Sequence, residues 1–467
     1  MDTRQLSVTN FLQAVTSGSL SITEVAEQTS AAIEDRKNLN TIISSNEKLL
    51  AENALTLQQK LSDKNILPLH GLPVLVKDNI DTEDFPTSAA CPALSEHQPK
   101  VDAGVVRRLK EAGALIVGKA NMHELAFGIT SNNAFTGAVH NPYNESCIPG
   151  GSSGGSAAAV SAGIVPVALG SDTGGSNRIP ASLCGVCGFR PSLARYPDDH
   201  LVNLSKTRDT VGIFAASVDD IIPVDAVLAE NAKPVHAELQ SLRIAVPRDP
   251  FFKDLENETA KVMETTLATL NNAGVNLIEI DMPDVFLLNE KISFPVALFE
   301  NIRELREYLQ VNKIGITLEE LTDNIASPDV KHIMQAALGE QNVPEEIYLE
   351  AIKVHRPQLI KMYADFFSDN KIDAMIYPTA PLTARPIGQD EMVEVNGQQV
   401  PTFPSYTRNG DPSSNAGIPS LSIPAGLASN GLPVGLSIDG PEGLDDEVLA
   451  IGSLFDSIIP KIKGPFA

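Results

Sequence analysis

The chain has 467 residues, of which 43% are hydrophobic and 20% are charged, and this composition excludes a disordered or fibrous protein. The formal net charge of −24 repels nucleic acid and anionic lipid, so we expect neither of them as a partner. The beginning of the chain, MDTRQLSVTN, lacks the basic and apolar parts of a signal peptide, and the sequence therefore predicts a cytoplasmic protein without a membrane span.

Hydrophobic spacing and turn residues predict helices and strands that alternate along much of the chain. In chain order we expect helices over 22–36 (starting with the capping box SITE at 21–24) and 45–63, a buried strand within 71–80, a helix and then a strand within 104–124, a helix over 156–163, strands over 164–170 and 241–247, a helix over 254–273 and a strand over 275–281. Such alternation is typical of a sheet covered by helices.

The pattern changes after residue 285. Residues 285–370 are predicted to be almost entirely helical, including one long helix within 344–370, and strands then return over 373–381, 419–426 and 433–440 before a last helix from about 445. We therefore predict a single α/β domain over 1–467. It comprises N-terminal helices (1–65), a core (66–284), a helical insertion (285–370) and a return to the core (371–467).

The four cysteines, Cys91, Cys147, Cys184 and Cys187, are too few to staple a chain of this length. The CGVC spacing at 184–187 has neither a second such pair nor a nearby histidine to complete a metal site. The sequence therefore predicts buried packing thiols and no bound metal.

Two loops rich in glycine and serine, GGSSGGS at 150–156 and SDTGGSNRIP at 171–180, are the candidate functional segments. Neither has the lysine of a phosphate-binding P-loop or the glycine spacing of a dinucleotide site. GGSSG does match a nucleophile elbow centred on Ser152, but the preceding segment 140–149 is polar and resembles a loop. No histidine lies in a recognisable catalytic segment, so a Ser-His-Asp site is disfavoured.

The helix and strand predicted between the two loops run out and back, and they would return residues 172–176 to the side of Ser152. Two facing serines require a base, and Lys77, at the end of the buried segment PVLVK, is the natural candidate. A lysine removes a proton only when it is neutral, and burial at the end of an apolar strand favours that form.

The segment 70–192 resembles the amidase signature family, through GLPVLVKDNID and PGGSSGGSAAAVSAGIVPVALGSDTGGSNRIPASLCGVCGFRPS. The resemblance implies one α/β domain around a mixed, twisted sheet and catalysis without a cofactor. It implies that Lys77 is the base, that Ser152 is the bridging serine with a cis peptide bond to Gly151, and that Ser176 is the nucleophile. The backbone N–H groups expected to form the oxyanion hole are those of Thr173, Gly174, Gly175 and Ser176.

Other residues near these motifs have less direct expected roles. We expect Asp172 and Arg178 to form a structural ion pair, and Ser153 to cap a helix or to support the site with its hydroxyl. The segment NMHELAFG at 121–128 matches the part of the family that lines the scissile amide, which makes Ala126 and Gly128 candidate substrate-binding residues and leaves His123 a structural role. Asn177 departs from the family, which usually has an aliphatic residue after the nucleophile.

Three further segments, 77–94, 188–212 and 406–426, resemble the branch of the family that holds indoleacetamide and mandelamide hydrolases. The resemblance implies that a small primary amide of the arylacetamide type is cleaved to a carboxylic acid and ammonia, in a pocket capped by 285–370 and 406–415. Allophanate or carbamate hydrolysis, a glutamine-dependent transamidase subunit with a small protein partner, and a catalytically silent binding homologue remain alternatives. The sequence is compatible with a homodimer.

Overall fold

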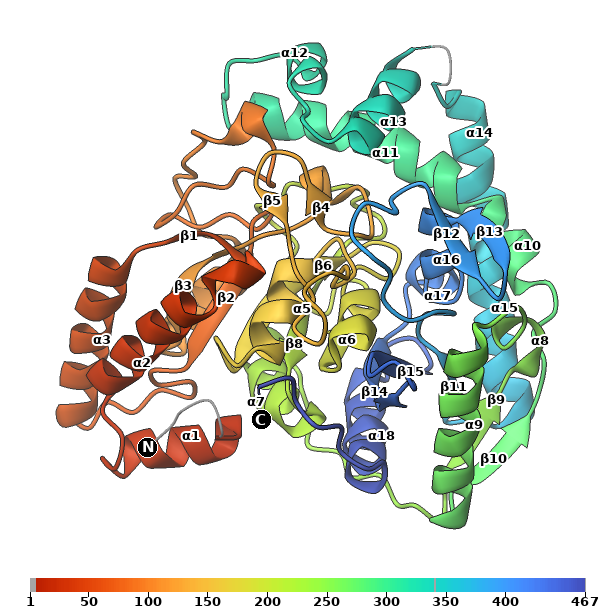
Figure 1. Cartoon of the computed structure of the whole chain (residues 1–467), viewed down its shortest axis with the longest axis horizontal. Coiled ribbons are helices and arrows are strands. Elements are labelled where there is room, and N and C mark those ends of the chain that lie inside the picture. The colour runs from red at the N-terminus through yellow and green to blue at the C-terminus, as the bar shows by residue number, and fades with distance from the viewer. Residues whose placement is uncertain (1–5, 340–341, 467) are drawn as a thin grey trace.

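The computed structural model describes residues 6–339 and 342–466 and folds them around one large mixed sheet (Figure 1). Eleven strands from the described residues form this sheet in the order β1-β3-β2-β6-β8-β7-β14-β15-β11-β9-β10. Their bounds are β1 Ile42–Ser45, β2 Pro73–Lys77, β3 Leu115–Ala120, β6 Val167–Asp172, β7 Cys187–Arg190, β8 Thr210–Ala215, β9 Arg243–Val246, β10 Asn276–Glu279, β11 Ala374–Pro378, β14 Ser420–Leu427 and β15 Pro433–Asp439. The predicted α/β class, a mixed sheet covered by helices, is confirmed.

The direction of the strands places the ends of β2 and β6 together. β2 is parallel to both β3 and β6, with Val76 opposite Leu169 in the register of the second pair. The carboxyl ends of parallel strands meet at one edge of a sheet, so Lys77 at the end of β2 lies at the same edge as Asp172 at the end of β6. The strands from β8 to β15 are antiparallel to their neighbours and connect this part of the sheet to a second parallel part, β11-β9-β10.

Helices pack around the sheet, and one group of them lies apart along the top of the view (α11 to α14 in Figure 1). The helices are α1 Val8–Thr16, α2 Ile22–Asp35, α3 Glu47–Ser62, α4 Gly104–Glu111, α5 Gly154–Ser161, α6 Arg178–Cys184, α7 Val218–Leu228, α8 Arg248–Phe251, α9 Asn257–Asn272, α10 Val285–Glu290, α11 Ser293–Val311, α12 Leu318–Asp323, α13 Pro328–Leu338, α14 Glu345–Glu350, α15 Arg356–Asn370, α16 Thr402–Thr407, α17 Asp411–Ala416 and α18 Asp445–Ile458. None of the described helices combines the length and hydropathy that crossing a bilayer requires.

Local sequence signals explain where several elements begin. The capping box predicted at the start of α2 is present, because Ser21 Oγ accepts a hydrogen bond from Glu24 N at 3.1 Å and Glu24 reaches back to Ser21 N. α5 begins at Gly154, two residues earlier than predicted, with Ser153 at its N-cap position but no hydrogen bond from that side chain to the helix. β6 begins at Val167 rather than at residue 164, directly after Pro166, which has no N–H for a ladder.

The single helix predicted within 344–370 is divided. A π-helical segment, Ala351–His355, separates α14 from α15. Two small hairpins, β4 Asn132–Asn133 with β5 Gly137–Ala138 and β12 Met392–Val395 with β13 Gln398–Pro401, are also absent from the predicted elements.

The described residues form four hydrophobic clusters, and two of them position the site. The larger core fills the space between the sheet and its helices and includes Val74, Leu169 and Ile213. A second core packs α11, α12 and α13 against segments 89–94 and 122–127. The second core therefore attaches these helices directly to the segment in which sequence analysis places the substrate-binding residues.

Candidate active site

Lys77 is completely buried at the end of β2, a strand in which all five residues are buried. Its Nζ donates hydrogen bonds to Ser152 Oγ at 2.7 Å and to Ser171 Oγ at 2.8 Å. Burial lowers the pKa of Lys77 to about 7, and the charges of Asp209 and Asp172 only partly oppose this effect. A substantial fraction of Lys77 is therefore neutral near pH 7.

Ser152 follows a cis peptide bond from Gly151, as the resemblance implies. Its hydroxyl accepts the Lys77 hydrogen bond, and its backbone carbonyl accepts a hydrogen bond from His123 N at 3.0 Å. The close packing leaves no room for a side chain at position 151, where a Cβ would lie 2.9 Å from the carbonyl carbon of Ile129. Ser152 is thus held between the Lys77 side chain and the segment 123–129.

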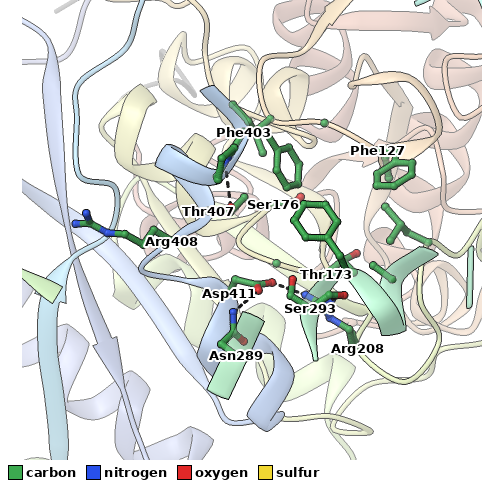
Figure 2. Close-up of a pocket in the computed structure, with 18 of the residues that line it drawn as sticks. Phe127, Thr173, Ser176, Arg208, Asn289, Ser293, Phe403, Thr407, Arg408 and Asp411 are labelled. Carbon is green, nitrogen blue, oxygen red and sulfur yellow. Dashed lines mark hydrogen bonds and ion pairs between the residues drawn. The ribbon is translucent and has the colours of Figure 1, made fainter. Parts of the chain in front are cut away.

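Ser176 lies in the turn between β6 and α6, and 8% of its surface is exposed. It is one of the residues that line a largely apolar pocket (Figure 2). Its hydroxyl makes no hydrogen bond within the part of the chain that the structure describes, whereas the hydroxyls of Ser152 and Ser171 both have partners. Of these three serines, Ser176 is therefore the one with a hydroxyl that is unbound and open to the pocket.

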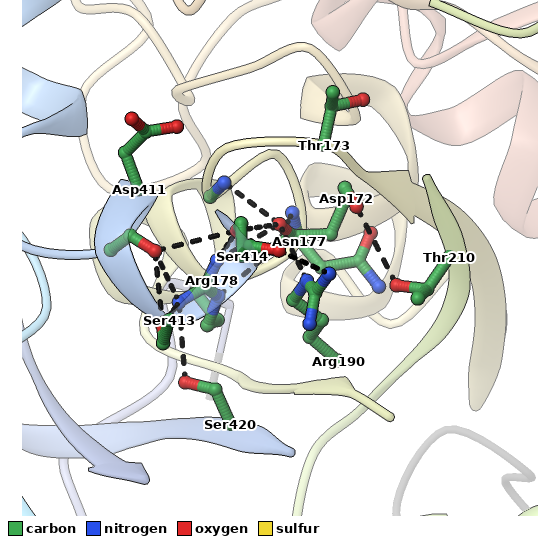
Figure 3. Close-up of polar contacts among 12 residues, drawn as sticks. Asp172, Thr173, Asn177, Arg178, Arg190, Thr210, Asp411, Ser413, Ser414 and Ser420 are labelled. Atoms are coloured by element: carbon green, nitrogen blue, oxygen red, sulfur yellow. Dashed lines mark hydrogen bonds and ion pairs between the residues drawn. The ribbon is translucent and has the colours of Figure 1, made fainter. Parts of the chain in front are cut away.

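Asp172 is the centre of a buried network of charges beneath this turn (Figure 3). Its Oδ1 accepts a hydrogen bond from Arg178 Nη2 at 2.9 Å and its Oδ2 accepts one from Arg178 Nε at 3.0 Å. Burial alone would raise the pKa of Asp172, but Arg178 and Arg190 outweigh it and hold the pKa well below its usual range. The ion pair expected between Asp172 and Arg178 is present.

Arg178 extends this network to residues far along the chain. Its Nη1 donates to the Gly410 carbonyl oxygen at 2.9 Å and to Ser413 Oγ at 2.8 Å, and its Nη2 donates to Ser414 Oγ at 2.6 Å (Figure 3). The turn that carries Ser176 is thus tied to α17 and to the residue that precedes it.

The four N–H groups predicted for the oxyanion hole are not equivalent. Gly175, with φ of 120°, donates its N–H to Asp172 Oδ1 at 2.7 Å, so this N–H is directed into the network and away from a substrate. The structure differs from the prediction for Gly175 in this respect, because the Asp172 carboxylate already accepts its N–H in a turn whose positive φ suits glycine. The N–H groups of Thr173, Gly174 and Ser176 have no hydrogen-bond partner in the described residues.

The pocket beside Ser176 has a volume of about 230 Å³ and walls formed largely by aromatic and aliphatic side chains (Figure 2). Four of the 16 phenylalanines of the chain line it: Phe127, Phe286, Phe294 and Phe403. Phe286 and Phe294 lie within the predicted cap 285–370, whereas Phe403 of α16 lies just before the other predicted cap segment, 406–415. An apolar pocket of this kind suits an aromatic group.

Ala126 and Gly128, the candidate substrate-binding residues, also line this pocket. Gly128 packs against the His123 ring so closely that a Cβ would collide with Nε2. That ring is held by Asp329, 3.0 Å from its Nε2, and by the N–H of Ser131, which donates to Nδ1 at 3.2 Å. His123 thus joins segment 123–131 to α13 and does not line the pocket.

Sequence analysis did not single out Ser171, which contacts the base directly. Ser171 Oγ accepts hydrogen bonds from Lys77 Nζ and, at 3.1 Å, from Asn79 Nδ2. Its position at the end of β6 beside β2 could have indicated this contact, because the two strands are neighbours. Arg208, Asn289 and Asp411, which line the pocket, gave no recognisable motif.

Ser153 and Asn177 lie behind the nucleophile turn, away from the pocket. The Ser153 side chain does not cap α5; its Oγ donates to the Ser171 carbonyl oxygen at 3.1 Å. Asn177 Nδ2 donates to the Phe189 carbonyl oxygen at 3.2 Å, and a Cβ at Gly212 would collide with this amide. The residue that departs from the family therefore fills a space against the sheet.

All four cysteines are buried and free, as expected for packing thiols. Burial raises the pKa of Cys184 above its usual value, which keeps the thiol protonated. Residues 6–339 and 342–466 contain no group of three or more histidine, cysteine, aspartate or glutamate side chains placed to hold a metal ion.

Comparisons with known proteins agree with this site. The sequence profile of the family described as Amidase matches residues 24–449. An indoleacetamide hydrolase of Rhizobium radiobacter is 44% identical over 439 residues, which are 93% of this chain and 93% of that protein. A mandelamide hydrolase of Pseudomonas putida is 38% identical over 460 residues, 95% of this chain and 89% of that protein.

Solved structures show the same similarity. A crystal structure of an amidase superposes with a TM-score of 0.87 and 31% identity, covering 97% of this chain and 100% of the other. Native peptide amidase from Stenotrophomonas maltophilia gives a TM-score of 0.85 and 26% identity, with 99% and 98% covered. The chain belongs to the amidase family, as its signature motifs predict, and it is an amide-hydrolysing enzyme.

Proposed function

We propose that this enzyme hydrolyses small primary arylacetamides to a carboxylic acid and ammonia, through an acyl-enzyme formed on Ser176. The observation that carries the proposal is the position of Ser176 on an aromatic pocket, with a free hydroxyl, in a structure that also holds Lys77 hydrogen-bonded to Ser152 in a buried pair. Relatives named for the hydrolysis of indoleacetamide and mandelamide support the same substrate class.

The buried lysine supplies the base in this proposal. Lys77, with a pKa lowered to about 7, accepts a proton only in its neutral form. Ser152 can accept a hydrogen bond from one side while donating to the other, so it passes the Ser176 proton to Lys77 and later returns a proton to the departing nitrogen. Lys77, Ser152 and Ser176 thus act as a Ser-Ser-Lys triad.

The bond changes follow from these roles. Ser176 Oγ forms a bond to the amide carbonyl carbon, and the negative charge that develops on the carbonyl oxygen is stabilised by the free N–H groups of Thr173, Gly174 and Ser176. Breaking the C–N bond releases ammonia and leaves the acyl group on Ser176. Water then attacks the ester, giving its proton to Lys77 through Ser152, and the acid leaves as Ser176 regains a proton.

The pocket accounts for the aromatic acyl group and for selection at the amine. Burial of a phenyl or indole ring between the four phenylalanines removes it from water. On the other side of the carbonyl, Ser152 is completely buried, so there is little space for an alkyl group on the amide nitrogen. We therefore expect primary amides to be preferred over N-alkyl amides.

A substrate panel with release of ammonia as the measurement tests the proposal. Phenylacetamide and indole-3-acetamide should be hydrolysed faster than their N-alkyl derivatives, than allophanate, and than glutamine with or without candidate partner proteins. Preference for allophanate, or activity on glutamine only with a partner, would contradict the arylacetamide class while leaving the family assignment intact.

The same protein should react with a fluorophosphonate probe, which forms an adduct with an activated serine. A chain that neither reacts with the probe nor releases ammonia from any amide of the panel would be a silent binding homologue. These two measurements together separate an inactive chain from an active enzyme with a different substrate.

A further inference from the structure

One wall of the aromatic pocket is polar, and it is built from Arg208, Asn289 and Asp411 (Figure 2). All three residues are at least nine-tenths buried: Arg208 is 2% exposed, Asn289 is 8% exposed and Asp411 is 7% exposed. Placing a charged pair against an apolar pocket costs free energy unless the charges are compensated. The hydrogen bonds among these residues compensate the buried charges and leave one acceptor position of Asp411 unused.

Asp411 is held by three donors from two directions. Arg208 Nη2 forms an ion pair with Asp411 Oδ1, while Asp411 Oδ2 accepts hydrogen bonds from Asn289 Nδ2 at 2.6 Å and from Asn415 Nδ2 at 3.3 Å. A carboxylate has about four acceptor positions, so one position remains, and it belongs to Oδ1. Asp411 is therefore fixed in orientation and still able to accept one more hydrogen bond.

The oxygen with this free position lies next to the nucleophile turn. A Cβ added to Gly174 would lie 2.7 Å from Asp411 Oδ1, and Gly174 is two residues before Ser176. Gly174, Ser176 and Asp411 all line the same pocket, so Oδ1 is close to the place where the carbonyl of a bound substrate must sit. A hydrogen-bond donor on the acyl group, close to the substrate carbonyl, would lie within reach of Asp411 Oδ1.

We propose that Asp411 is a specificity-determining residue that accepts a hydrogen bond from an N–H or O–H group on the acyl part of the substrate. The proposal rests on the proposed function and deepens it: the substrate class becomes arylacetamides that carry such a donor, either a ring N–H or an α-hydroxyl. Hydrogen bonds to an ionised acceptor are stronger than neutral ones. A site built to bind such a donor also rejects an analogue that lacks it, because a buried acceptor is then left without a partner.

Matched pairs of substrates provide the test with the unmodified enzyme. Indole-3-acetamide is compared with 1-naphthylacetamide and 1-methylindole-3-acetamide, which lack the ring N–H, and mandelamide is compared with phenylacetamide, which lacks the α-hydroxyl. We expect kcat/KM to be about 10- to 100-fold higher for the donor-bearing member of one pair. Preference in the indole pair identifies the ring N–H, and preference in the mandelamide pair identifies the hydroxyl. Equal rates within both pairs would overturn the proposal.

The variant Asp411→Asn assigns the preference to this side chain. It should lower the ratio within the preferred pair several-fold, because the neutral amide oxygen is a weaker acceptor than a carboxylate oxygen. Glu290→Gln, which changes the exposed acidic residue lining the same pocket, should preserve the ratio. An unchanged ratio in Asp411→Asn would overturn the proposal. If Asp411→Asn does not fold, equal rates within both pairs in the unmodified enzyme still overturn the proposal. Hydrolysis of phenylacetamide without any donor preference would leave the proposed function standing while this inference fails.

Discussion

Lys77 Nζ lies 2.7 Å from Ser152 Oγ, although the two residues are 75 positions apart in the chain. This contact joins the end of β2 to the loop before α5 in a place that water does not reach. In the proposed mechanism, the protonation state of this one buried amine controls the rate of hydrolysis.

The pH dependence of hydrolysis should follow Lys77. Its pKa is lowered to about 7 by burial, and only the neutral amine can accept a proton. We expect kcat/KM for an arylacetamide to fall about tenfold per pH unit below pH 7 and to level off above it, measured in buffers of constant ionic strength. A rate that is constant between pH 5.5 and 8 would exclude Lys77 as the base.

Replacing Lys77 by methionine should remove activity without destabilising the protein. The pKa of Lys77 in the folded protein is lowered from 10.5 to about 7, so folding carries the full cost of burying a charge at pH 7 and below. That cost disappears as pH rises from about 7 to about 10.5, because the unfolded chain binds the extra proton there. Urea unfolding at pH 7 and pH 9.5 should show the advantage of Lys77→Met shrinking at the higher pH; an advantage that does not change with pH would contradict the burial argument.

Ser176→Ala should abolish both hydrolysis and fluorophosphonate labelling while the fold is retained, because the missing hydroxyl is the proposed attachment point. Circular dichroism checks that the fold is retained, and intact-protein mass spectrometry checks that the labelling is lost. Ser368→Ala, which changes an exposed serine of α15, is the control and should react normally. Adduct mass on Ser152 in the parent enzyme would show that the roles of the two serines are reversed.

Asp172→Ala should strongly destabilise the protein. It leaves the buried guanidinium groups of Arg178 and Arg190 without their carboxylate, and breaking a buried pair in this way costs about 3–5 kcal/mol. Asp365→Ala is a matched control, since it breaks the Lys361 ion pair at 2.6 Å on the surface and should cost about 1 kcal/mol or less. Urea denaturation measures both free energies of unfolding, and equal losses would show that the network does not support the fold.

Phe403→Ala should impair aromatic substrates selectively. Loss of this wall of the pocket is expected to lower kcat/KM for phenylacetamide by about 10- to 200-fold. Propionamide, which is too small to fill the pocket, should lose much less. Similar losses for the two amides would indicate damage to the reacting groups and not to the pocket.

The parts of the site that lie in continuous motifs could be predicted from the sequence. Lys77 ends an apolar strand, and Ser152 and Ser176 lie in glycine-rich loops whose spacing resembles the amidase signature, so the sequence alone predicts one site for the three residues. The division of the chain at 65, 284 and 370 stays a prediction, because no boundary in the structure tests it.

Asn396 and Gly397 form the turn of the β12–β13 hairpin with φ of 51° and 83°. This pair is a recognisable hairpin signal that the predicted elements do not use.

The polar wall of the pocket could not be predicted in the same way. Arg208, Asn289 and Asp411 come from three segments that share no motif, and only the packing of α10 and α17 beside the loop at 208 brings them together. The direction of the Gly175 N–H was likewise not predictable, because it depends on where the Asp172 carboxylate is held by two arginines. Long-range contacts of this kind leave no local signal in the sequence.

The hydrogen bonds from Arg178 to Gly410, Ser413 and Ser414 also determine when the active site can form during synthesis of the chain. During synthesis, Lys77, Ser152 and Ser176 leave the ribosome long before residues 410–414, which the nucleophile turn needs for its support. A nascent or truncated chain that ends before residue 410 therefore contains every proposed member of the triad and still lacks a supported turn. Activity should appear abruptly, and only when nearly nine-tenths of the polypeptide has emerged.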